Sequence, residues 1–139
     1  PALDWDVAGP DGGTRTPAVT GSWVALALAL AKLTDRKALR RPALRDQIAA
    51  VSVGHVAGEL LVDLCYTEDS SARVDLNLVA TASGAVVEIQ GTAEGEPVAR
   101  ADVDRMIDLG LDAIASLCRE QSQALAAAGV SLERLLIRP

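Results

Sequence analysis

The sequence predicts an α+β fold: a mixed or antiparallel sheet with helices packed on one face. Three observations carry this prediction. A segment rich in Leu and Ala precedes a central block in which apolar and polar residues alternate, and a long segment with helical spacing follows that block. Strands grouped together and flanked by helices are typical of the α+β class. The 139 residues suffice for one domain with its own core.

The first 33 residues predict a strand, a turn and a buried helix. Residues 3–7 alternate apolar and acidic side chains, which is the period of a half-buried strand. Glycine and proline in residues 9–13 then end regular structure. We expect Thr16 to cap a helix and Pro17 to be its first residue. Residues 18–33 are rich in good helix formers and apolar on nearly all sides, so we expect this helix to be buried.

Residues 34–46 carry most of the positive charge of this half of the chain and are interrupted by Pro42. Their basic side chains are Arg36, Lys37, Arg40, Arg41 and Arg45. The simplest interpretation is a solvated loop that connects two elements. The alternative is a basic lip that faces RNA.

The central block predicts four strands. Residues 48–56 and 60–66 form a hairpin around a short link, and residues 86–90 form the fourth strand after a Ser-Gly turn. In the third strand, Val74, Leu76, Leu78 and Ala80 share one face. Asp75 and Asn77 therefore lie on the opposite, polar face.

A long amphipathic helix is expected over residues 100–127, where apolar residues recur every three or four positions. Gly129 is expected to end it. The chain thus divides into a domain over residues 1–128 and a short C-terminal tail over residues 129–139.

Composition excludes several functions. A net charge of −6 argues against a free-standing, non-specific nucleic-acid binder. Cys65 and Cys118 lie far apart, and the single histidine, His55, has no nucleophile to pair with, so we expect reduced thiols in a cytoplasmic protein and no catalytic triad. The longest apolar run, Trp23–Ala31, is shorter than a membrane helix needs, and no targeting peptide is visible. A chain that begins at Pro1 in a strand pattern resembles part of something longer.

Two local patterns predict a site for an anion and a cation. The turn at residues 12–16 stands where a helix begins, so free N–H groups and the positive end of the helix dipole point there, and Arg15 adds a bidentate phosphate donor. Asp69 and Asp75 could converge on one divalent cation, because carboxylate oxygens are suitable ligands for it. By themselves, a Gly-Gly turn and an acidic loop are more often structural than functional.

Three motifs carry a resemblance to a known family. They are D-G-G-T-R-T at residues 11–16, E-D-S-x-A-x-x-D-x-N at residues 68–77, and E-[IV]-Q-G-T-A-E-G-E-P at residues 88–97. Together they resemble ribonuclease PH, a phosphate-dependent exonuclease related to polynucleotide phosphorylase and to exosome core subunits. The resemblance runs from Asp4 to about Ala127 and covers the latter half, and a little more, of a family member.

The resemblance implies a fold, an activity and a set of site residues. The fold would be the ribonuclease PH-like variant of the ribosomal protein S5 domain 2 architecture. The activity would be 3′→5′ trimming of tRNA, and processing of other structured RNA such as rRNA precursors, by a nucleotidyltransferase that uses inorganic phosphate and Mg²⁺ or Mn²⁺. The implied roles are phosphate binding by Gly13, Thr14 and Arg15, catalysis and metal binding by Asp69 and Asp75, and support of the site by Gln90, Thr92 and Glu94.

The resemblance also implies partners and leaves alternatives open. Members assemble as a hexameric ring, a trimer of dimers, so a homo-oligomer is expected. Because the resemblance lacks the N-terminal part of a family member, a separate N-terminal half is a further possible partner. The absent part would bring a further phosphate-contacting arginine and much of the basic surface that guides RNA, which accounts for the acidic net charge. The alternatives are a non-catalytic ring or scaffold subunit and an inactive, truncated remnant of the same fold. Among the roles of the two aspartates, metal binding and proton donation both remain open.

Overall fold

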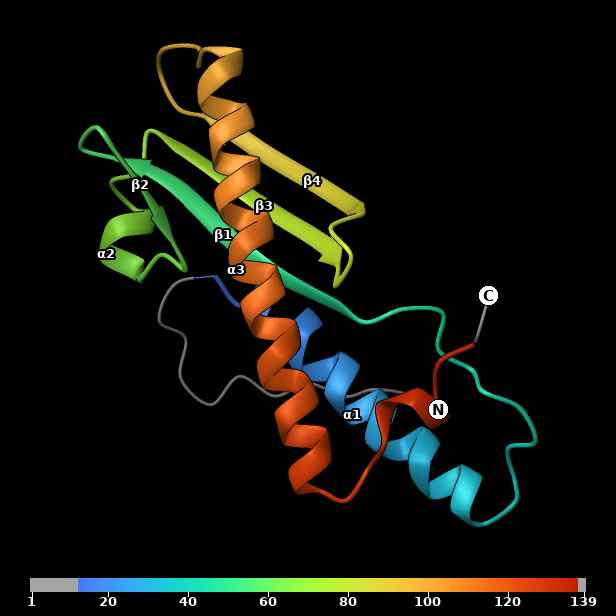
Figure 1. Ribbon diagram of the computed structural model, residues 1–139. Helices are drawn as coiled ribbons and strands as arrows, with labels where there is room; N and C mark the ends of the chain where they lie inside the picture. Colours follow the sequence, from blue (N-terminus) through green and yellow to red (C-terminus); the bar gives the residue numbers. More distant parts are fainter. Residues whose placement is uncertain (1–12, 138–139) are drawn as a thin grey trace.

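The computed structural model describes residues 13–137, so the strand expected over residues 3–7 lies outside the described residues (Figure 1). The regular elements, in chain order, are α1 (Arg15–Asp35), β1 (Ile48–Val56), β2 (Glu59–Val62), α2 (Tyr66–Asp69), β3 (Val74–Thr81), β4 (Val86–Ala93), α3 (Arg100–Ala127) and the short 3-10 helix η1 (Leu132–Arg134).

The four strands form one antiparallel sheet in the order β2-β1-β3-β4, which confirms the predicted α+β class. β1 lies in the centre and pairs with β3 along eight residue positions, from Ile48 opposite Thr81 to His55 opposite Val74. β4 is an edge strand, and a shift of register between Val79 and Ala80 marks where it begins to pair with β3.

α3 packs across one face of the sheet and forms the main core with it (Figure 1). Val53, Leu78, Met106 and Ile114 are at most 1% exposed. Burying an aliphatic side chain of this size contributes about 1.5–3 kcal/mol. The helix approaches the sheet closely at Gly110, where an added Cβ would lie 2.8 Å from Leu78 Cδ2. This face is the one that the period of β3 predicts to be apolar.

α1 packs against β1 where β2 ends. β2 pairs with β1 only from Val53 to Val56, which leaves the backbone of Ala50 without a strand neighbour on that side. The Thr20 hydroxyl accepts a hydrogen bond from the Ala50 N–H (3.0 Å) and donates one to the Ala50 carbonyl (3.2 Å). Thr20 therefore satisfies both backbone groups that the short second strand leaves open.

The segment that follows Gly129 packs onto a second apolar cluster. Gly129 takes a positive φ of 74° just after the C-cap residue Ala128, as expected for the end of a helix. Leu135 is 2% exposed, and its buried neighbours in the cluster are Trp23, Ala27, Leu30, Ala31, Leu44 and Leu125. Residues 129–137, expected as a short tail, thus fold back against α1 and the end of α3.

Several predicted boundaries are wrong, and the fourth strand, for example, runs to Ala93 rather than to residue 90. The second strand was expected to continue to Tyr66, but it ends at Val62, because Asp63 adopts a left-handed backbone (φ 58°) that turns the chain away. α1 begins at Arg15 rather than at Pro17, and Thr16 is a buried helical residue rather than the cap. Pro17 is tolerated in the first turn because an N–H there has no partner within the helix.

α1 is the one helix among the described residues that is long and apolar enough to cross a membrane by length and composition. A helix that lines a protein core passes the same test. Trp23, Ala27 and Leu30 are buried against the C-terminal segment and α3, and the Trp23 indole N–H donates to the Asp46 carbonyl (3.2 Å). Five of its 21 residues are buried, so the helix is only partly covered and the expectation of a buried helix is met only in part.

Candidate active site

Asp75 lies on the sheet face opposite α3, as the period of β3 predicts. Its direct neighbours in the sheet are Gly54 of β1 and Thr92 of β4. Asn77, two residues along β3, shares this face and donates a hydrogen bond from Nδ2 to Asp75 Oδ2 (3.1 Å). Asp75 is therefore held at a defined place on a polar strip in the middle of the sheet.

Leu64 folds the chain after β2 over this same face. Its N–H donates to the Ser52 hydroxyl (3.3 Å), the Asp63 N–H donates to the Ser52 carbonyl (2.9 Å), and Leu64 itself is 3% exposed. It fills the space above Gly54, where an added Cβ would lie 2.3 Å from Leu64 Cδ1. Gly54 therefore makes room for the segment that leads to Asp69.

α2 brings Asp69 to Asp75. Glu68 accepts a hydrogen bond from the Cys65 N–H (2.9 Å), and the Asp69 N–H donates to the Cys65 carbonyl (2.9 Å), so a single helical turn sets the position of the loop. The Asp69 side chain is exposed. Its negative charge is one of the causes that raise the pKa of Asp75, so the two predicted aspartates lie within electrostatic range of one another.

The carboxyl group of Asp75 is in an unfavourable environment for a free anion. Burial, and then the negative charge of Asp69, raise its pKa above the ordinary value, and the Asn77 hydrogen bond only partly opposes them. Among the described residues, no group donates a hydrogen bond to the buried Oδ1 atom. A buried carboxylate oxygen without a donor is suited to take up a proton or a cation.

The chemistry of this pair is compatible with a divalent cation whose remaining ligands would be water and phosphate oxygens. Asp69 and Asp75 supply hard oxygen ligands, and the described residues contain no group of three or more His, Cys, Asp or Glu side chains that could hold a metal. Mg²⁺ is usually bound through one or two carboxylates, with water and phosphate oxygens completing its shell. Two aspartates, one with an unpartnered oxygen, match that pattern.

Within the part of the chain that the structure describes, no side chain caps the backbone N–H groups at the start of α1. Thr14 is the N-cap residue, but its side chain makes no capping hydrogen bond, and no acidic residue lies in the first turn. Gly13 and Thr14 are exposed. The first N–H groups of the helix and its positive dipole end are therefore available to an anion. Gly12, the remaining glycine of the predicted turn, lies outside the described residues.

Arg15 connects this helix start to β4. Its guanidinium donates to the Gln90 side-chain oxygen and forms an ion pair with Glu88. Glu88 and Gln90 lie opposite Val79 and Asn77 of β3, so they project on the same sheet face as Asp75. Arg15 thus belongs to the face that carries the two aspartates, and half of its side chain remains exposed (53%).

The three residues expected to support the site, Gln90, Thr92 and Glu94, lie at different distances along β4 and the segment that follows it. Gln90 contacts Arg15, and Thr92 lies directly opposite Asp75. Glu94 follows the end of β4, where its N–H donates to the Arg73 carbonyl (2.9 Å). Glu88, for which the sequence predicted no role in the site, lies within β4 and pairs with Arg15. Its alternation with Gln90 and Thr92 along the strand was the signal that could have placed it at the site.

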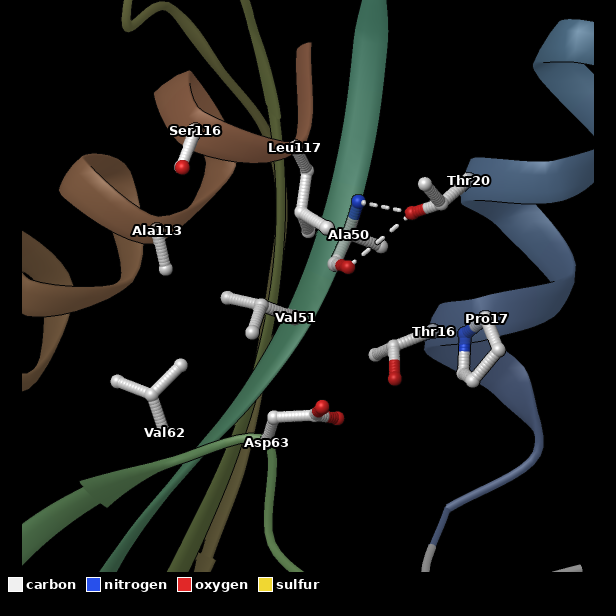
Figure 2. Close-up of a pocket in the computed structure, with 10 residues that line it drawn as sticks. All are labelled: Thr16, Pro17, Thr20, Ala50, Val51, Val62, Asp63, Ala113, Ser116 and Leu117. Carbon is white, nitrogen blue, oxygen red and sulfur yellow. Dashed lines mark hydrogen bonds between the residues drawn. The ribbon is translucent and has the colours of Figure 1, made fainter. Parts of the chain in front are cut away.

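A cavity of about 430 Å³ lies between the start of α1, the end of β2 and α3, with Ala50 and Val51 of β1 in its wall (Figure 2). Its lining is mostly apolar and includes Ala113 and Leu117 of α3 and Val51 and Val62 of the sheet. The side chain of Asp63, the residue after β2, points toward Thr16 of α1. Asp69 and Asp75 do not line this cavity. It is separate from the polar face described above.

Residues 46–113 match the model of the 3′ exoribonuclease family, domain 2. Three curated relatives, all named ribonuclease PH, come from Synechococcus sp., Moorella thermoacetica and Saccharopolyspora erythraea. They are 48%, 53% and 53% identical to this chain over 122, 123 and 127 residues, which is 88%, 88% and 91% of the chain. Over most of its length the chain is therefore similar to members of the ribonuclease PH family.

The matches cover 49%, 49% and 51% of those relatives, so this chain spans about half of their length. Among solved structures, an archaeal exosome core matches 56% of this chain and 31% of its own, with 22% identity and a TM-score of 0.49.

Proposed function

We propose that this chain carries the catalytic groups of a phosphate-dependent 3′→5′ exoribonuclease, which trims tRNA 3′ ends and other structured RNA in the cytoplasm and releases nucleoside diphosphates. The observation that carries the proposal is the common sheet face of Arg15, Asp69 and Asp75. A phosphate donor at a helix start and a pair of carboxylates lie on one side of the sheet, and residues 46–113 match a family model of 3′ exoribonucleases.

In the proposed reaction, inorganic phosphate is the nucleophile. The Gly13 N–H, Thr14 and Arg15 hold it at the start of α1, where the helix dipole favours an anion. A phosphate oxygen forms a bond to the terminal phosphorus of the RNA, and the bond from that phosphorus to the preceding 3′ oxygen breaks. The 3′ oxygen takes up a proton, and the terminal nucleotide leaves as a nucleoside diphosphate.

Asp69 and Asp75 have two alternative roles in this reaction. As ligands they would hold Mg²⁺ or Mn²⁺, which when bound offsets the repulsion between the phosphate and the phosphodiester. In the alternative, Asp75 donates the proton to the 3′ oxygen, a role that suits it because burial and the charge of Asp69 raise its pKa. Gln90 and Glu88 orient Arg15, and Thr92 flanks Asp75.

The direct test is nucleoside diphosphate release from a tRNA with a short 3′ extension by the 139-residue chain, with and without inorganic phosphate. We expect release that requires phosphate and Mg²⁺ and proceeds from the 3′ end. Release of nucleoside monophosphates in the absence of phosphate would identify a hydrolase and contradict the proposal. No release at all would favour the non-catalytic subunit or the inactive remnant.

We expect Arg15→Ala to weaken the use of phosphate more than it lowers the maximal rate. The change removes a charged donor from the phosphate site but leaves Asp69 and Asp75 in place. The phosphate concentration for half-maximal release should rise by about tenfold or more, the scale of one charged hydrogen bond. A phosphate titration measures this, with Arg119→Ala as the control, because Arg119 is an exposed arginine of α3. An unchanged phosphate dependence would exclude Arg15 from the site.

We also expect this chain to associate with copies of itself, as in the hexameric ring that the resemblance implies. Val86, Val87 and Ile89 of the edge strand β4 are 45–58% exposed, and a groove of about 400 Å³ runs along α1 past Trp23 and Leu26. Apolar surface of this kind on an edge strand and a helix favours association. Light scattering at micromolar concentration should find a species larger than a monomer, and a clean monomer would contradict the expectation.

A further inference from the structure

Positive charge is concentrated in one exposed segment between α1 and β1. The basic segment, defined here as residues 36–45, contains five exposed cationic side chains: Arg36, Lys37, Arg40, Arg41 and Arg45. The chain has a net charge of −6, so the rest of the molecule carries −11 against the +5 of these side chains. The cluster is therefore a local feature of an acidic protein.

The basic segment is anchored at both ends. After α1, Lys37 takes a left-handed backbone (φ 58°), and the Ala38 N–H donates to the Leu33 carbonyl (2.9 Å). At the other end, the Leu44 N–H donates to the Leu135 carbonyl (3.0 Å), and the Ile137 N–H donates to the Leu44 carbonyl (2.8 Å). The cations are thus carried on a backbone whose ends are held by the core, which lowers the entropic cost of binding a partner.

These five side chains form no ion pair among the residues that the structure describes. Each of four other arginines pairs with a carboxylate: Arg15, Arg100, Arg105 and Arg134. The negative end of the α1 dipole favours cations at Arg36 and Lys37, but its effect fades within the last turn. It does not explain Arg40, Arg41 and Arg45, which lie beyond the helix. Clustering like charges costs free energy unless a bound anion compensates for it.

A groove of about 580 Å³ lies beside the basic segment, between it and the C-terminal segment. Arg41 borders it from one side and Arg134 from the other, and the apolar lining comes from Pro42, Leu136 and Ile137. Glu133 also lines it. Arg134 pairs with Asp35, so Arg41 supplies the guanidinium of this groove that has no ion pair among the described residues. A guanidinium beside an apolar surface suits a phosphate with the sugar and base attached to it.

We propose that the basic segment is a second RNA contact, which binds the phosphodiester backbone of the substrate away from its 3′ end. This inference rests on the proposed function. α1 has 21 residues and joins Arg15 at its start to the basic segment at its end, a span of about 30 Å. Four of the five cations are arginine, which binds phosphate oxygens bidentately. A long RNA bound through its 3′ end would reach this segment, and a short one would not.

The test measures how tRNA binding depends on salt. Fluorescence anisotropy of labelled tRNA is recorded without inorganic phosphate, so that no phosphorolysis occurs, for the unmutated chain and for Arg40→Gln/Arg41→Gln. Each lost phosphate contact lowers the slope of log affinity against log salt by about 0.7–0.9. We expect the slope to fall by about 1.4–1.8, and the affinity at ~0.1 M salt to fall by at least about tenfold.

The matched control is Arg100→Gln/Arg119→Gln, which removes the same charge from exposed positions of α3. A fall in slope for the basic-segment variant alone supports the inference, and equal slopes for both variants overturn it. If the unmutated chain releases no nucleoside diphosphate yet shows this difference, the proposed activity fails while the RNA contact stands. Binding to anionic phospholipid vesicles that needs Arg40 and Arg41, with tRNA binding unaffected by the change, would overturn it in favour of a membrane surface.

Discussion

Asp75→Asn should lower the rate of nucleoside diphosphate release by at least about a hundredfold, the usual scale for loss of a positioned acid or base. Asparagine keeps the size of the side chain and can still accept the Asn77 hydrogen bond. It removes the carboxylate whose Oδ1 atom has no donor among the described residues, so it cannot hold a divalent cation in the same way or donate a carboxylic proton. The fold and phosphate binding should remain nearly intact.

The same variant should be more stable than the unmutated chain at neutral pH. Burial and the charge of Asp69 raise the pKa of Asp75 in the folded state above its value of about 3.9 in an unfolded chain. Above both pKa values, the folded state therefore carries a penalty for the charged form, which asparagine abolishes. As the pH falls through the folded pKa the penalty fades, and below the unfolded pKa the two proteins should be equally stable in this respect.

Two measurements check this prediction together. Nucleoside diphosphate release across a phosphate titration gives the loss of rate, and thermal melting from pH 3 to pH 7 gives the difference in stability. Wild-type-like release by Asp75→Asn would refute the assigned role. A variant that is inactive and also less stable at pH 7 would mean that the loss reflects damage to the fold.

The elements with strong periodicity were predictable from sequence. The ends of β1 and α3 agree with the expected residues 48–56 and 100–127, because each carries an unbroken apolar pattern and ends at turn-forming glycine. The polar face of Asp75 followed from the alternation of β3 for the same reason. Local spacing decides these features, and no distant contact overrides it.

The features that depend on distant contacts were not predictable in this way. The end of β2 is set by the left-handed Asp63, and Leu64 leaves the strand pattern to pack on Gly54, ten residues earlier. The pairing of Arg15 with Glu88 joins residues 73 positions apart. No period or short motif reports such contacts, because they depend on how α1 and the loop before α2 lie against the sheet.

The close contact between Leu64 and Gly54 leads to the second prediction, a loss of stability and activity in Gly54→Ala. Gly54→Ala would place a methyl group 2.3 Å from Leu64 Cδ1, far inside van der Waals contact. A glycine in a strand costs roughly 0.5–1 kcal/mol relative to alanine. Here the clash should exceed that gain, because overpacking a buried site costs about 1–3 kcal/mol. We therefore expect net destabilisation, together with a loss of activity, since moving Leu64 moves the segment that carries Asp69 next to Asp75.

The control is Gly91→Ala in β4, where the nearest atom to an added Cβ would be the Asp75 carbonyl oxygen at 3.4 Å, an ordinary contact. Leu64→Ala alone should cost about 2–5 kcal/mol through the cavity it leaves. Gly54→Ala in that background adds a methyl group to the emptied space, so the double variant should be more stable than the sum of the single effects predicts. Urea unfolding of the four proteins measures this coupling. Additive costs would show that Leu64 does not rest on Gly54, and that another contact holds Asp69 beside Asp75.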